Sequence, residues 1–297
     1  MVIAALRPVR RARVPPHAYF LVSAVFHYLG PAFAVLLFAR VAPLGVAWLR
    51  IATAAAIFAG WRRPWTMLRT GSGDARRAVV MLGAVLAAMN ISFYLAIARL
   101  PLGTVGAIEF LGPIGLAAAG MRSARNFGAL ALAIAGVYVL TDVRIAGEPL
   151  GFVFAFANCA LFMLYVVLGH RIAGEGGAQG IDRLAGAMLV AMAVAFPFGI
   201  ADAAPALASP LLLLAGIGVG VCSSVIPYVC DQLAMARLPR ATFALLLALL
   251  PATASAIGLL VLGQVPSSRD LAGIALVIAG VAFHREPVAA ATPISNT

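Results

Sequence analysis

Residues 95–101 read LAIARLP and residues 233–239 read LAMARLP, so a seven-residue stretch occurs twice with a change at one position. The two copies lie 138 positions apart, and the same offset places Pro113 on Pro251. A chance match between Ala- and Leu-rich segments is the alternative, but it does not account for the aligned prolines. The match predicts that the chain consists of two related halves.

The composition indicates a membrane protein. Of the 297 residues, 63% are hydrophobic and 10% are charged, whereas a soluble domain has about 25% charged residues. The three cysteines lie inside apolar runs without metal-ligand spacing, so no zinc site or disulfide framework is expected. We expect an integral membrane protein with no soluble domain, no metal and no cofactor.

Apolar runs that approach the roughly 20 residues needed to span a bilayer occur ten times. The predicted spans are 17–39, 43–60, 77–98, 103–121, 125–141, 149–169, 183–201, 210–236, 241–262 and 269–284. Sixteen of the 21 basic residues, all arginines, fall on the side of the N-terminus and four on the other side. They lie in the short gaps between spans, which indicates membrane topology rather than nucleic-acid binding. The positive-inside rule then predicts that both termini are cytoplasmic.

Ten spans in two related halves give five spans per half, in residues 1–143 and 147–285. With an odd number, the second half enters the membrane from the opposite side. The predicted fold is therefore an all-α polytopic membrane protein made of two inverted five-helix repeats. Secondary transporters use this plan, with the substrate site between the repeats near the midplane. Residues 286–297 are polar and are predicted to form a disordered cytoplasmic tail.

Several short motifs lie along these spans. They are Leu49-Arg50, Met89-Asn90, Phe93-Tyr94, Pro101-Leu102-Gly103, Glu109-Phe110-x-Gly112-Pro113, Pro227-Tyr228, Arg237-Leu238-Pro239 and Thr242-Phe243. Together with the two five-helix halves, they resemble the EamA family of the drug/metabolite transporter superfamily. Within that family they look most like the threonine/homoserine exporter branch. The resemblance covers nearly the whole chain, and the Glu-Phe-x-Gly-Pro stretch is its most specific part.

The resemblance implies a multi-pass protein of the bacterial inner membrane that exports small metabolites. The branch implies amino acids such as threonine or homoserine, exported by proton antiport. Its partners would be the substrate, protons and the bilayer, and a monomer and a homodimer both remain open. The chain departs from the family pattern at Leu250, where members often carry Glu, and at Asp231, where the branch often has Glu.

Glu109 is the leading candidate for a functional carboxylate. A charged group at mid-membrane costs roughly 2.5–3.5 kcal/mol on insertion scales, so it needs a compensating role. Pro113 cannot donate to the Glu109 carbonyl four residues earlier, so a carboxylate and a free carbonyl meet at one kink. They are suited to an ammonium group or a proton. The alternative is a structural ion pair between Glu109 and Arg50.

His27 and Arg50 are the next candidates. His27 precedes Pro31 by the same four residues, and it is either a ligand or proton relay or a packed polar side chain. Arg50 matches the geometry of a substrate carboxylate. It is otherwise expected to extend toward the membrane surface or to pair with Glu109.

Asp231 is expected near the inner end of its helix, partly solvated, with a binding, gating or structural role. Hydrogen-bonding side chains from other spans are included in the candidate site with it: Asn90, Tyr94, Asn158, Tyr165 and Tyr228. Each of these alone is more often a helix-packing contact. Helix kinks are predicted at Pro31, Pro113, Pro227 and Pro251.

Other classes of function are less well supported. No HExxH, GxSxG or paired-carboxylate motif is present, so an enzyme is not expected. Gly216-x-Gly218-x-Gly220 lies in an apolar run without the context of a nucleotide loop, and its spacing predicts close helix packing. A drug exporter remains an alternative within transport. A passive channel is another, although a repeat with kinked helices favours alternating access.

Overall fold

The computed structural model describes residues 15–65, 69, 71–109, 111–112, 124–141, 148–173, 177–238, 246 and 250–283. Within these ranges all regular secondary structure is helical. The elements are α1 (Pro16–Leu37), α2 (Pro43–Arg62), α4 (Gly73–Ile97), α5 (Leu102–Glu109), α7 (Ala124–Thr141), α8 (Pro149–Ala173), α9 (Gly177–Leu207), α10 (Pro210–Gly220), the π-helix η1 (Val221–Val225), α11 (Ile226–Met235), α13 (Leu250–Leu262) and α14 (Ser268–Phe283). The all-α prediction is confirmed for this part of the chain.

Within the described ranges, six helical stretches are long and apolar enough to cross a membrane. They are 16–37, 43–62, 73–97, 149–172, 179–207 and 210–235. The last is α10, η1 and α11 joined end to end. The predicted spans 103–121 and 241–262 are described only as α5 and α13, because their remaining residues lie mostly outside the described ranges. The Pro113 kink and the tail 286–297 also lie outside them.

The cytoplasmic connection expected between residues 171 and 182 is largely helical instead. Helix α8 continues to Ala173, and α9 already begins at Gly177. Helix α9 is therefore 31 residues long, which at 1.5 Å per residue is about 45 Å and exceeds a hydrocarbon core of about 30 Å. The apolar run predicts only the membrane-spanning part of α9. The ends of the helix carry more polar residues, which the sequence analysis expects in the connections between spans.

Local sequence signals explain where several helices begin. Pro16, Pro43 and Pro210 each occupy the first helical position of α1, α2 and α10, where the missing N–H costs nothing. The Ser72 hydroxyl caps α4 by accepting from the Ala75 N–H at 3.3 Å. These residues fix where α1, α2, α4 and α10 begin.

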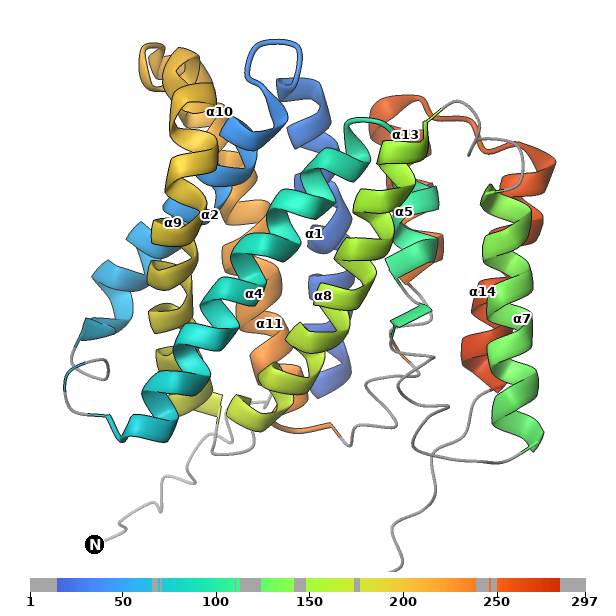
Figure 1. Ribbon diagram of the computed structural model, residues 1–297, viewed down its shortest axis with the longest axis horizontal. Helices are drawn as coiled ribbons and strands as arrows, with labels where there is room; N and C mark the ends of the chain where they lie inside the picture. Colours follow the sequence, from blue (N-terminus) through green and yellow to red (C-terminus); the bar gives the residue numbers. More distant parts are fainter. Residues whose placement is uncertain are drawn as a thin grey trace, which may run out of the picture.

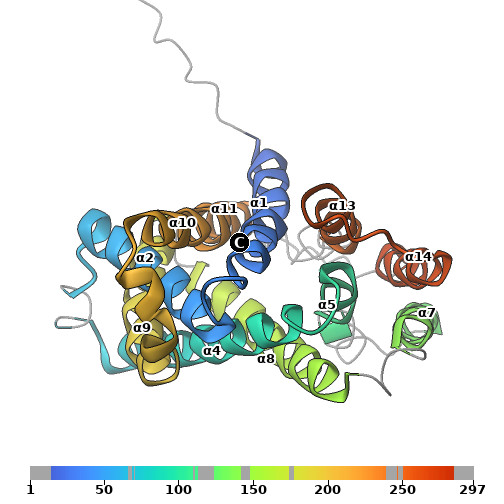
Figure 2. The same cartoon turned by 90° about the horizontal axis from the view of Figure 1, so that it is seen from above.

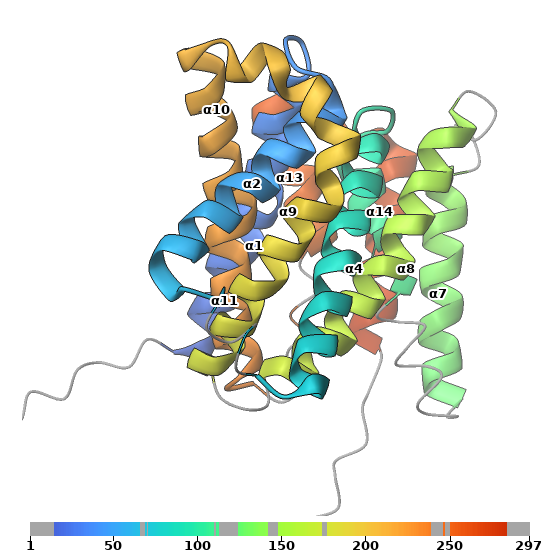
Figure 3. The same cartoon turned by 60° about the vertical axis from the view of Figure 1, so that its left-hand side comes forward.

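The helices pack in a pattern that brings distant segments together (Figure 1). Helix α1 packs against α11 and α13, and α4 packs against α8 and α9. Helix α2 lies along α9 and α10, and α5 lies along α13. Helices α7 and α14 form a pair at one end of the molecule, as the view from above shows (Figure 2). The turned view shows α9 and α4 lying side by side (Figure 3).

Glycines allow the closest of these approaches. A Cβ added at Gly220 would lie 2.6 Å from the Thr53 Cβ of α2, and one added at Gly216 would lie 3.2 Å from Leu49 Cδ1. The predicted close helix packing at this glycine stretch is therefore confirmed. Gly30 of α1 similarly faces Ser223, whose backbone N would lie 2.6 Å from an added Cβ.

Candidate substrate and proton site

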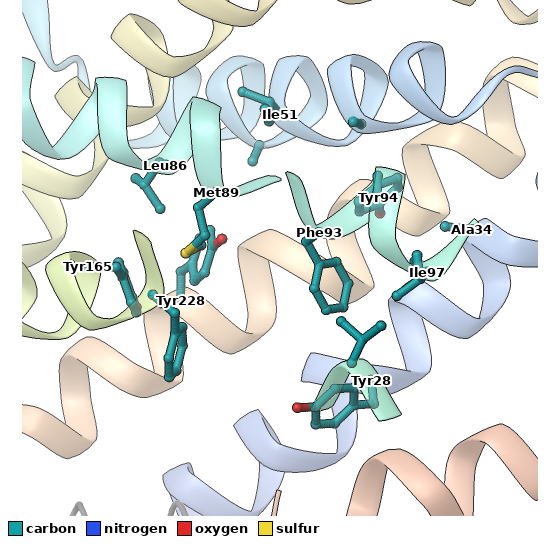
Figure 4. Close-up of a cluster of buried hydrophobic side chains, with 14 of the residues drawn as sticks. Tyr28, Ala34, Ile51, Leu86, Met89, Phe93, Tyr94, Ile97, Tyr165 and Tyr228 are labelled. Carbon is teal, nitrogen blue, oxygen red and sulfur yellow. The ribbon is translucent and has the colours of Figure 1, made fainter. Parts of the chain in front are cut away.

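A small cavity lies between six helices at the centre of the bundle. It is lined by His27, Arg50, Met89, Asn90, Phe93, Glu109, Asn158 and Tyr228. About 10 Å³ is open to the centre of a water-sized molecule, which is the space of about one water. The free space in this conformation is therefore smaller than an amino acid. Its apolar side is formed by α4, where Met89 and Phe93 lie near Tyr228 and Tyr28 (Figure 4).

Glu109 ends α5 and is buried, with 2% of its surface exposed. The Tyr28 hydroxyl donates to its Oε2 at 3.1 Å, and Asn158 Nδ2 donates to its Oε1 at 3.0 Å. His27 Nε2 lies 3.8 Å from Oε2. Both carboxyl oxygens thus have a donor, which compensates for part of the cost of burial.

Arg50 is buried on α2 with 4% of its surface exposed. Its Nε donates to Ser224 Oγ at 2.7 Å, and its Nη2 donates to the Ser223 carbonyl at 2.6 Å and to Tyr228 Oη at 3.4 Å. The guanidinium also lies 5.5 Å from the Tyr94 ring centre and 5.9 Å from that of Tyr228, within cation–π range. Arg50 therefore does not extend to the membrane surface.

The alternative of a structural ion pair between Arg50 and Glu109 is not found in this conformation. Both side chains line the cavity, yet Arg50 hydrogen-bonds to η1 and α11, and Glu109 is bound by Tyr28 and Asn158. The ion pairs seen among the described residues include His27–Glu109 and Arg62–Asp182. The opposite charges of Arg50 and Glu109 suggest an ion pair. In the structure each side chain is instead hydrogen-bonded by neutral groups from other helices.

Pro227 explains how Arg50 is held. Proline has no N–H, so the carbonyl four residues earlier, at Ser223, loses its α-helical donor. The chain relaxes into the π-helix η1, and the Ile226 N–H reaches back five residues to the Val221 carbonyl. The free Ser223 carbonyl then accepts from Arg50. The predicted Pro227 kink is thus a local π segment that builds half of the arginine site.

The other predicted kinks are described in part. Pro31 lies inside α1, and the kink there stays a prediction. Pro251 is the second residue of α13, and most of the residues before α13 back to 239 lie outside the described ranges.

Asp231 lies beside the cavity rather than in its wall. Ser23 Oγ donates to its Oδ1 at 2.5 Å, and the Tyr165 hydroxyl donates to its Oδ2 at 3.4 Å. Asp231 is 7% exposed, so the partial solvation expected from its place near a helix end is wrong. Side chains from α1 and α8 cover it, and the sequence of α11 alone gives no sign of them.

Three polar atoms around the cavity have no protein partner among the described residues. They are Asn90 Oδ1, Asn158 Oδ1 and Tyr94 Oη, each buried. Asn90 uses its amide nitrogen to donate to the Leu86 carbonyl at 2.7 Å and to Tyr228 Oη at 3.4 Å. Buried polar atoms without partners are costly, and here they surround Arg50 and Glu109.

Sequence reasoning missed Tyr28, Ser23, Ser223 and Ser224. Tyr28 adjoins His27, and Ser23 precedes His27 by one helical turn. Neither side chain is charged, so the search for charged groups inside apolar spans does not find them. Ser223 had a usable signal, because it precedes Pro227 by the same four residues that relate Glu109 to Pro113.

A second cavity of about 210 Å³ lies between α5, α13 and α14. Its polar lining includes Thr104, Ser255, Gln264 and Asp270. None of the residues predicted for the site lines it.

Comparisons with known proteins place the chain among transporters. The sequence profile of the EamA-like transporter family matches residues 149–284. The threonine/homoserine exporter RhtA of Salmonella typhimurium strain SL1344 is 30% identical over 270 residues, which cover 87% of this chain and 88% of that protein. The chain belongs to the EamA-like transporter family. The threonine/homoserine exporter RhtA of Escherichia coli K12 is also 30% identical, over 84% of each chain.

A solved crystal structure shares the fold of this EamA-like transporter. The two chains superpose with a TM-score of 0.59 over 90% of this chain and 96% of the other, at 22% sequence identity. The family profile and the exporter relatives confirm the resemblance predicted from the sequence, and the protein is a membrane transporter. The profile match covers most of the second predicted half of the chain.

Proposed function

We propose that this EamA-like transporter exports small zwitterionic amino acids, such as threonine or homoserine, across the bacterial inner membrane by proton antiport. The main observation behind this proposal is that Arg50 and Glu109 line one central cavity without pairing with each other. Both side chains are buried, one as a cation and the other as a carboxyl group. The two relatives named as threonine/homoserine exporters support the substrate class.

The arginine side of the site suits a substrate carboxylate. A guanidinium has five N–H donors, and the described hydrogen bonds of Arg50 involve Nε and Nη2. The two Nη1 donors are left for a carboxylate, and the low-dielectric surroundings strengthen such a bond. The Tyr94 ring lies 5.5 Å from the Arg50 guanidinium, and its buried hydroxyl has no described partner.

The Glu109 side suits a substrate amine. Besides its carboxyl group, the cavity offers the unpaired amide oxygens of Asn90 and Asn158. An ammonium group needs acceptors for three N–H bonds, and these groups supply that number. A side-chain hydroxyl, such as that of threonine, can donate to any of these acceptors that the substrate amine leaves unpaired.

Competition at Glu109 accounts for the coupling. The ionised carboxylate attracts the substrate ammonium, and the protonated acid does not. Entry of a proton from outside therefore favours release of the substrate outside. Deprotonation toward the cytoplasm restores the binding form, so the two species exchange across the membrane.

The packing of the helices supports ten spans in two inverted repeats, residues 1–143 and 147–285. Under the 138-residue offset Asn90 corresponds to Tyr228, and these residues are hydrogen-bonded to each other at 3.4 Å. A contact between equivalent positions is expected beside a pseudo-two-fold axis. The pairs α2–α9, α5–α13 and α7–α14 join equivalent spans in the same way. The repeat plan and the arginine count together favour cytoplasmic termini.

Transport in inside-out membrane vesicles tests the proposal. Vesicles acidified inside should accumulate labelled threonine against its gradient, and a proton ionophore should abolish the accumulation. Equilibration without accumulation would indicate a channel. Accumulation of apolar drugs but not of threonine would indicate the drug-exporter alternative.

A further inference from the structure

The site described above contains one carboxyl group, and a second lies close by without an assigned role. Asp231 of α11 does not line the cavity, yet it is 7% exposed and held by Ser23 and Tyr165. These bonds satisfy the hydrogen-bonding capacity of the carboxyl group. Burying a carboxyl group within an apolar span is nevertheless costly, and such residues usually mark a functional site.

Helix α1 connects the two carboxyl groups. Ser23 and His27 are four residues apart, so they lie on the same face of α1, about 6 Å apart along its axis. Ser23 binds Asp231, and His27 Nε2 lies 3.8 Å from Glu109 Oε2. The imidazole therefore lies beside Glu109 and one helical turn from the hydrogen bond between Ser23 and Asp231.

The surroundings of His27 allow it to change partners. Its ring packs edge-on against Tyr28 and Phe162, with ring centres 5.1 Å and 6.2 Å away. These contacts are apolar and do not fix a hydrogen bond. The cavity that His27 lines has room for about one water.

The other titratable and charged groups near His27 already form hydrogen bonds with other residues or are weaker acids than a carboxyl group. Arg50 of α2 is hydrogen-bonded to η1 and α11. Tyr28 of α1 donates to Glu109, and Tyr165 of α8 donates to Asp231. Tyr228 of α11 accepts from Arg50 and Asn90. Cys159 of α8 packs against Gly112, and the thiol is a weak acid.

We infer that His27 carries protons from Glu109 to Asp231, and that Asp231 is the inner site from which they leave for the cytoplasm. The protonated Glu109 gives its proton to His27 Nε2. The imidazolium releases its other ring proton, from Nδ1, through a water or after rotation toward Asp231. Asp231 then passes the proton to water beyond the end of α11. This helix ends at Met235, four residues after Asp231. Each step moves one proton. The imidazole is left protonated at Nε2, and a ring flip or a tautomer exchange through the cavity water frees Nε2 for the next proton.

The inference rests on the proposed proton antiport but addresses a different step. Substrate binding needs Arg50 and Glu109, whereas release of the proton inside needs His27 and Asp231. A purely structural Asp231 would be required in every transport mode. A relay is required only when net proton movement occurs.

Reconstituted full-length protein separates these modes, with labelled threonine as the probe. Counterflow exchanges internal for external threonine at equal pH and needs no net proton movement. Accumulation driven by a pH gradient does need it. We expect Asp231→Asn and His27→Gln to lower gradient-driven accumulation about ten-fold or more. Counterflow should stay close to wild type in Asp231→Asn, because Asp231 does not line the cavity. Asp202→Asn, a carboxyl on α9 apart from this network, should change neither.

Loss of counterflow in Asp231→Asn would make this residue structural or substrate-binding and would overturn the relay. Unchanged gradient-driven accumulation would overturn it as well. A wild-type protein that exchanges threonine without any response to the pH gradient would refute antiport while leaving threonine transport intact.

Infrared difference spectroscopy after a pH jump gives a readout that does not depend on substrate. Two protonated-carboxyl bands are expected, one lost in Glu109→Gln and one in Asp231→Asn. The Glu109 band should relax more slowly in His27→Gln. Equal relaxation in that variant, or the absence of either band, would contradict the relay even if threonine proves not to be the substrate.

Discussion

The Arg50 guanidinium donates to the Ser223 carbonyl at 2.6 Å, and this carbonyl is available because Pro227 cannot donate to it. The π-helix η1 is therefore part of the proposed binding site as well as a break in the helix. A substrate carboxylate at Nη1 would share the guanidinium with the protein carbonyl, so the local shape of η1 sets where the positive charge lies.

Replacing this proline tests that relationship. In Pro227→Ala the new N–H can bond to the Ser223 carbonyl, which restores an α-helix and competes with Arg50. Hydrogen bonds to charged groups contribute about 1.5–3 kcal/mol, so we expect threonine export to fall about ten-fold or more while membrane abundance stays normal. Pro205→Ala, another proline inside a helix, is the matched control. Normal export by Pro227→Ala would show that Arg50 does not depend on the free carbonyl.

The close contact between α10 and α2 predicts a sharp difference between two neighbouring glycines. An added Cβ at Gly220 meets Thr53 Cβ at 2.6 Å and the Arg50 carbonyl at 3.0 Å, whereas one at Gly218 meets nothing within 4 Å. Overpacking costs about 1–3 kcal/mol, so Gly220→Ala should lower the thermal unfolding temperature in detergent. Gly218→Ala should keep or raise it, because alanine is the better helix former. Equal effects would place the helices farther apart than described.

The sequence predicted the position of the central residues better than their partners. Glu109, Arg50 and Asp231 stand out because charge inside an apolar span is costly, whatever surrounds it. Their partners are hydroxyl, amide and carbonyl groups from other helices, such as Ser23 208 positions before Asp231. Spacing within one helix carries no information on such contacts.

Proline spacing was the exception, because the carbonyl that a proline frees is fixed by covalent geometry. The rule that singled out Glu109 before Pro113 also applies to Ser223 before Pro227, and there the freed carbonyl has a partner. The helix ends were harder to predict, as α9 shows, because polar residues remain helical beyond the bilayer.

Reporter fusions test the predicted orientation. With 16 arginines on one side and four on the other, a reporter at Thr297 should be active only as a cytoplasmic fusion. One in the connection 143–148 should be active only outside the inner membrane. A periplasmic C-terminus would contradict both the arginine count and the five-plus-five plan.

The final prediction concerns Glu109 itself. Glu109→Gln should insert and fold, because a glutamine keeps the shape and one carbonyl oxygen for Tyr28. Its amide nitrogen can bond to Asn158 if that side chain turns its unpaired Oδ1 inward. The variant cannot titrate, so threonine accumulation and its response to external pH should both be lost. Glu109→Asp should retain part of the activity.

Combining Glu109→Gln with Arg50→Ala distinguishes coupling from a structural charge pair. If the two residues mainly neutralised each other, removing both charges would restore abundance and export together. Arg50 is instead bound by Ser223, Ser224 and Tyr228, so we expect the double variant to lose the substrate carboxylate site as well and to remain inactive. Abundance and vesicle accumulation should be measured side by side for each single and double variant. Wild-type accumulation by the double variant would exclude Glu109 as the coupling residue and leave His27 and Asp231 as the titratable groups to examine.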